Sequence, residues 1–224
     1  MTASQPALTL SEGAEERLRT ELDSGIAHLE RDARKHALGS LTETVERIAP
    51  LLDGILSIPA PEPWATMRAA YLLSLTPAAV EHLTSLPLIP LEPEDGVSDE
   101  DAAACAMRCL LDLLAAFGEG WVAVLEGRGW AGGPVAVQGG AVPDLTVRVR
   151  LRSIVGLARE KVLAWARPYG EFPSVALEAD GAQEVVHPEV GGWEGEILHM
   201  WDDITAALDA LAANDPADPD AAHT

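Results

Sequence analysis

Apolar residues recur along most of this chain in steps of three and four, which is the spacing of amphipathic helices. Two such stripes open the sequence, over residues 11–38 and 41–55. Gly39 between them predicts the C′ residue of the first helix, and Ser40 with Glu43 predicts a capping box for the second. We therefore expect an antiparallel pair of helices at the start of the fold.

Two prolines interrupt the next stripes. Pro50 lies inside the second apolar stripe and predicts that the helix kinks or restarts there, because proline lacks the N–H that the helix needs. Thr76 and Pro77 together predict the N-cap and first turn of a separate short helix that ends near residue 86. Both expectations follow from local backbone chemistry alone.

The pattern of apolar and glycine residues changes in the middle of the chain. Residues 98–117 predict a helix that is apolar nearly all round and is our candidate for the centre of the core. Residues 121–126, WVAVLE, fit a strand or a short helix equally well. The glycine-rich residues 127–143 predict a loop or a small hairpin around Gly139–Gly140. A single helix is expected over about 193–213.

Residues 144–167, DLTVRVRLRSIVGLAREKVLAWAR, carry two competing patterns. The first nine residues alternate between apolar and polar positions, as a strand does, while the whole segment also follows a helical stripe. Asp144 is a good N-cap for the longer element. A helix is therefore favoured over a strand.

These elements define a mainly α fold, a bundle of about six to seven helices. Candidate short β-hairpins fall in residues 121–143 and 173–187. We expect one mainly helical domain, with a glycine-rich insertion, a loop or hairpin insertion, a flexible N-terminus and a disordered acidic tail. These divisions correspond to residues 9–213, 118–143, 168–192, 1–8 and 214–224.

The net charge of the chain is −21, which argues against duplex DNA or an anionic membrane as the main partner. Neither a secretory signal nor an apolar run long enough to span a membrane is found. Cys105 and Cys109, four residues apart in a helical pattern, are badly placed for a disulfide. A reduced, cytoplasmic or nuclear protein is the expectation.

Positive charge gathers in one place. Residues 148–167 carry a net +5, whereas residues 168–224 contain no Lys or Arg and carry −13. In a helix, Arg148, Arg152 and Arg159 line one exposed face. The favoured interpretation is that this face packs against the acidic segments of the same chain. Binding of an acidic partner protein is the second alternative, and binding of phosphate or RNA is a minor third.

The other motifs in the sequence do not indicate a nucleotide-binding, metal or catalytic site. Residues 127–132 match G-x-G-x-x-G, but the sequence that follows is a poor helix, so we interpret the match as coincidence. The six histidines lack metal-ligand spacing. We therefore expect no cofactor, no metal and no recognisable catalytic residues. Trp130, in the glycine-rich loop, is a candidate binding anchor if its ring is exposed.

Three functions remain open from the sequence. The first is a non-catalytic helical interaction protein, an adaptor or a subunit of an intracellular multiprotein assembly, whose protein partners are acidic or bind through apolar helix faces. The alternative is a module for an anionic ligand or RNA that uses the basic helix 144–167. The third is an enzyme whose site is assembled from distant residues. The first is the favoured hypothesis, and enzymatic activity is the less favoured one.

Overall fold

The computed structural model describes residues 11–89, 99–137, 139–169 and 192–214. Within them the chain forms seven α-helices, one short 3₁₀ helix and one two-stranded antiparallel hairpin, so the mainly α fold is confirmed. The elements are α1 (Glu12–Arg34), α2 (Leu41–Leu56), α3 (Trp64–Thr84), α4 (Asp99–Leu125), β1 (Gly129–Trp130), β2 (Pro134–Val135), α5 (Leu145–Ala166), η1 (Arg167–Tyr169), α6 (Gly192–His199) and α7 (Asp202–Asn214). The predicted N-terminal segment, 173–187 hairpin and nearly all of the acidic tail lie outside the described residues.

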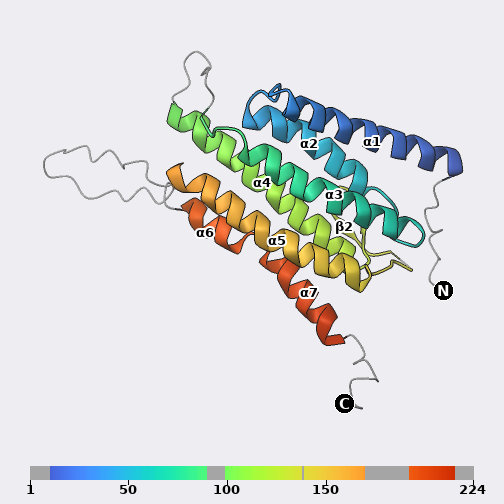
Figure 1. Ribbon diagram of the computed structural model, residues 1–224. Helices are drawn as coiled ribbons and strands as arrows, with labels where there is room; N and C mark the ends of the chain where they lie inside the picture. Colours follow the sequence, from blue (N-terminus) through green and yellow to red (C-terminus); the bar gives the residue numbers. More distant parts are fainter. Residues whose placement is uncertain (1–10, 90–98, 138, 170–191, 215–224) are drawn as a thin grey trace, which may run out of the picture.

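The helices pack side by side in chain order, with one exception (Figure 1). α1 packs on α2, α2 packs on α3 and α4, and α3 also packs on α5. The exception is α4, which lies behind α3 and reaches across to α7. α6 and α7 cover the side of α5 that faces away from α3, and this places α5 between two groups of helices.

The first two helices form the predicted pair. The capping box is confirmed, because the Glu43 N–H donates to Ser40 Oγ (3.2 Å) and the Ser40 N–H donates to Glu43 Oε2 (3.4 Å). The predicted C′ residue is wrong: His36, with φ 52°, takes the left-handed position instead of Gly39. α1 ends earlier than the stripe predicts because N–H groups just beyond its end already satisfy its last free carbonyls.

Both prolines lie inside continuous helices, so of the two alternatives at Pro50, a kink or a restart, the restart is wrong, and the separate helix at Pro77 is wrong too. An interior proline costs a helix about 3 kcal/mol. Residues on both sides of each proline are buried, and each buried aliphatic side chain contributes roughly 1.5–3 kcal/mol. Burial along the whole length of the helix therefore outweighs the loss of one backbone hydrogen bond.

α4 is the central core helix, as predicted, but it is longer than expected. The undecided segment 121–126 is helical through residue 125 and continues α4 without a break. Trp121 is fully buried there, and its Nε1 donates to Thr76 Oγ1 on α3 (3.0 Å). The Thr76 hydroxyl in turn donates to the Leu72 carbonyl (2.7 Å). This short chain of hydrogen bonds satisfies the polar atoms in the middle of the bundle.

The glycine-rich segment contains a short hairpin, as predicted, although its turn lies earlier than Gly139–Gly140. Gly129 pairs with Val135 and Trp130 with Pro134, and Gly132 in the turn has φ 71°. Gly140 instead lies against the Gly127 carbonyl, so closely that a Cβ would come within 1.7 Å of that oxygen. Glycine is required at position 140 for this backbone contact.

Candidate functional site

The basic stretch folds as a helix, not a strand. Asp144 is its N-cap and accepts a hydrogen bond from the Val147 N–H through Oδ1 (2.8 Å). The buried side chains of α5 recur at steps of four, three and four and form one continuous face: Leu151, Val155, Ala158 and Val162. Packing of this face against α3 and the C-terminal helices selects the helical period over the strand period.

Two arginines of α5 form ion pairs with acids of the same chain. Arg152 forms an ion pair with Asp209 on α7 (2.6 Å), and Arg159 forms one with Asp202 at the start of α7 (2.5 Å). Arg148 lies one turn before Arg152 and is half-buried. The favoured interpretation of the basic face, contact with the acidic C-terminal part of the same chain, therefore matches the geometry of Arg152 and Arg159.

Both ion pairs lie at the surface, where water screens the attraction between the charges, so they orient α7 more than they stabilise it. On the opposite side of α5, Lys161 pairs with Glu81 on α3. Trp165 donates from Nε1 to the Leu86 carbonyl (2.8 Å), which holds the end of α5 beside the end of α3. As expected from its place on the apolar stripe, Trp165 is half-buried and packs against the core.

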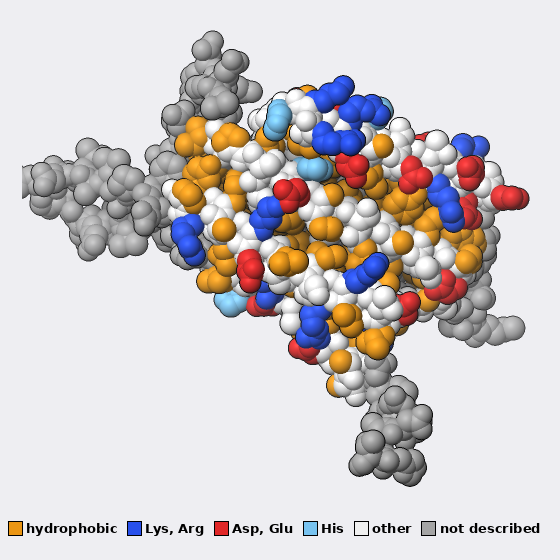
Figure 2. Space-filling model, viewed as in Figure 1, with side chains coloured by type: hydrophobic (Ala, Val, Ile, Leu, Met, Phe, Trp, Pro, Cys, Tyr) orange, Lys and Arg blue, Asp and Glu red, His pale blue; other side chains and the backbone are white. Residues whose placement is uncertain are grey.

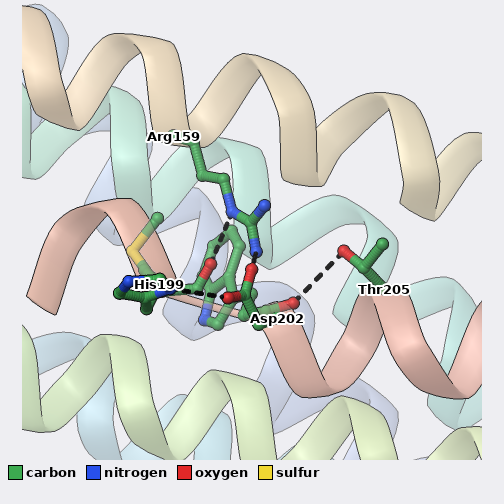
Figure 3. Close-up of polar contacts among 6 residues, drawn as sticks. Arg159, His199, Asp202 and Thr205 are labelled. Atoms are coloured by element: carbon green, nitrogen blue, oxygen red, sulfur yellow. Dashed lines mark hydrogen bonds and ion pairs between the residues drawn. The ribbon is translucent and has the colours of Figure 1, made fainter. Parts of the chain in front are cut away.

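The predicted single helix over 193–213 is instead two helices, α6 and α7, with a break at Met200 and Trp201. Trp201 has φ 65°, a conformation that costs a non-glycine residue about 1–2 kcal/mol. Arg159 Nε donates to the Met200 carbonyl that the break leaves free (2.6 Å; Figure 3). Trp201 Nε1 donates to the Leu114 carbonyl (2.6 Å). The break therefore turns an indole ring into the core against α4.

Asp202 begins α7 and receives two contacts. His199 Nδ1 lies 2.9 Å from Asp202 Oδ2, and Arg159 reaches the other carboxylate oxygen from α5 (Figure 3). The hydrogen bond with His199, together with the charge and hydrogen bond of Arg159, lowers the pKa of Asp202 below its usual value of 3.8. The carboxylate is thus favoured in the folded state.

A carboxylate whose pKa is lowered by folding stabilises the fold above its unfolded pKa, and this contribution disappears as the pH falls through the lowered value. We therefore expect Asp202→Asn to make thermal unfolding less sensitive to acid below about pH 3.8. The midpoint of unfolding, followed by circular dichroism from pH 7 to pH 2, measures the effect. Asp203→Asn is the control, because Asp203 forms no ion pair within the described residues. Equal acid sensitivity of wild type and Asp202→Asn contradicts this account.

Trp130 is half-buried in β1 and packs against the core. Part of the side chain stays accessible to solvent, and its role as a binding anchor stays a prediction. The G-x-G-x-x-G residues form the β1–β2 hairpin and not the start of a helix, so the geometry that a pyrophosphate needs is not formed there. The described residues contain no cluster of three or more potential metal ligands.

A second face of α5 was not predicted from the sequence. Three large apolar side chains on this helix are exposed: Leu145 (62%), Val149 (58%) and Leu157 (67%). Ser153 and Gly156 lie between these three residues, and we call the surface that the five residues form the outer face.

Leu157 also borders a shallow groove of about 480 Å³ between α3 and α5, whose apolar walls include Pro77, Val80 and Ile154. Figure 2 shows apolar side chains at the surface between the charged ones on this side of the molecule. The sequence did contain a signal for the outer face, because Leu145, Val149 and Leu157 do not belong to the helical stripe that is buried.

Comparisons with protein-family models, with curated proteins and with solved structures gave no match. Among the described residues, every helix is too short or too polar to cross a membrane. What the protein does is therefore inferred from its own geometry.

Proposed function

We propose that this chain is a non-catalytic, helical interaction protein that binds another protein through the outer face of α5 and the adjoining groove. The observation that carries the proposal is the exposure of Leu145, Val149 and Leu157 on one side of a helix that is otherwise well packed. Neighbouring exposed apolar side chains of this size mark protein-binding surfaces more often than isolated ones do. Burial of each contributes roughly 1.5–3 kcal/mol to association.

The alternative, an anionic-ligand or RNA module, has less support. It depends on Arg148, Arg152 and Arg159, and two of these already contact carboxylates of α7. A phosphate would have to displace those carboxylates, so it would gain little net electrostatic energy. A protein that binds the outer face displaces only water, because these apolar side chains are exposed to solvent.

We expect Leu157→Asp to weaken partner binding at least tenfold, because the substitution places a charge where an apolar contact forms. The tagged full chain, co-expressed with an untagged copy, is purified after nuclease treatment, and stoichiometric partners are identified by mass. Leu198→Asp is the matched control, since Leu198 is also exposed (52%) but lies on α6.

Three results bear on the proposal. Retention of a stoichiometric protein by wild type and by Leu198→Asp, with loss in Leu157→Asp, supports it. Equal retention by all three variants, or no retained protein at all, contradicts it. Material that disappears on nuclease treatment would favour the RNA alternative.

A further inference from the structure

Two charged side chains on α5 have no ion-pair partner in the part of the chain that the structure describes. Arg150 and Glu160 are both exposed, and neither forms an ion pair within the described residues. Three other cations of this helix are engaged in ion pairs, which are Arg152–Asp209, Arg159–Asp202 and Lys161–Glu81. α5 therefore presents one positive and one negative side chain beside an apolar surface.

We propose that the partner seated on the outer face is a second copy of this chain, bound through an antiparallel pair of α5 helices. This inference rests on the proposed function, since it names the partner of the same surface. A two-fold interface uses the same patch on both copies and must be self-complementary. An apolar stripe flanked by one acid and one base meets that requirement, because the acid of each copy can meet the base of the other.

The spacing of the residues fixes the register. With the two-fold axis at Ser153, Val149 of one copy lies opposite the partner's Leu157, because each is four residues from the axis. Glu160 is seven residues after Ser153 and Arg150 is three residues before it. Glu160 therefore comes within four residues, about one helical turn, of the partner's Arg150. Two apolar contacts and two ion pairs form around one axis.

The middle of the outer face allows the helices to approach closely. Ser153 is small, and a Cβ built on Gly156 meets no other atom within 4 Å, so that side of the helix is open. α5 has 22 residues and is roughly 33 Å long, which gives the pair several turns of contact. Leu145 extends the apolar stripe toward one end.

The mass of the full chain in solution, measured by light scattering across a concentration series, tests the inference. The measurement is made at 0.15 M salt, where the Debye length is about 8 Å, so that repulsion between two chains of charge −21 is screened. We expect a concentration-dependent rise toward twice the 23.7 kDa of one chain. Glu160→Arg and Arg150→Glu should each raise the dissociation constant at least tenfold.

The double variant Arg150→Glu/Glu160→Arg should restore dimerisation, because the pairs re-form with their charges exchanged. Glu119→Arg, an exposed change on α4, is the control and should leave the mass unchanged. A wild-type chain that stays monomeric up to about 1 mM, or a double variant no better than the single ones, overturns the inference. If the tagged chain then retains a different protein through Leu157, the proposed function stands without the dimer; if it retains none, both fail.

Discussion

Trp121→Ala is expected to lower the free energy of unfolding by about 3–5 kcal/mol, the usual cost of removing a fully buried aromatic side chain. Trp121 is 0% exposed and lies where α4 meets α3. Its removal leaves a cavity in the centre of the bundle and also leaves the Thr76 hydroxyl without its donor. Since a domain of this kind is stable by only about 5–15 kcal/mol, the variant should unfold at a much lower urea concentration. Circular dichroism at 222 nm follows the transition.

A second variant separates the effect of losing the Trp121–Thr76 hydrogen bond from the effect of losing the volume of the Trp121 ring. Thr76→Val keeps the size of the side chain but removes the acceptor of Trp121 Nε1, and should cost about 1–3 kcal/mol. Loss of less than about 1 kcal/mol in Trp121→Ala would show that α4 is not the centre of the core.

The second large effect is expected at the break between α6 and α7. Trp201→Ala should destabilise the fold by about 3–5 kcal/mol, because the indole is only 5% exposed and its Nε1 donates to α4. Alanine also keeps the cost of the left-handed backbone at φ 65°. Trp201→Gly loses the same ring but relieves that backbone cost, so it should be about 1 kcal/mol more stable than Trp201→Ala.

Urea unfolding of both variants measures the difference. Amide hydrogen exchange in α7 shows in addition whether this helix detaches before the rest of the bundle. If Trp201→Gly were less stable than Trp201→Ala, the left-handed conformation at this position would be contradicted.

Local rules were sufficient wherever short-range hydrogen bonds decide the structure. Ser40 with Glu43 and Asp144 predicted two helix starts that the structure confirms. The same rules failed at Pro77, and a restart at Pro50 did not occur, because burial against neighbouring helices outweighs the local preference for a break. They also failed at Trp201, where contacts from α4 and α5 compensate an unfavourable backbone angle.

The candidate site was predicted in part. The charge imbalance between residues 148–167 and 168–224 predicted that the arginines meet acids of the same chain, and Arg152 and Arg159 do so. The outer face was not predicted, because its exposure depends on where α3, α6 and α7 pack around α5, and a single sequence does not give that arrangement. Trp130 shows the same limit, since its burial depends on the hairpin folding back on the core.

The ion pairs between α5 and α7 have a consequence for any polyanion that meets this protein. Asp202 and Asp209 are held beside Arg159 and Arg152 by the packing of α7 on α5, so they compete with any external anion for these arginines. A nucleic acid in solution must outcompete carboxylates that never diffuse away. Binding of a polyanion at Arg152 and Arg159 would therefore require both ion pairs to break first.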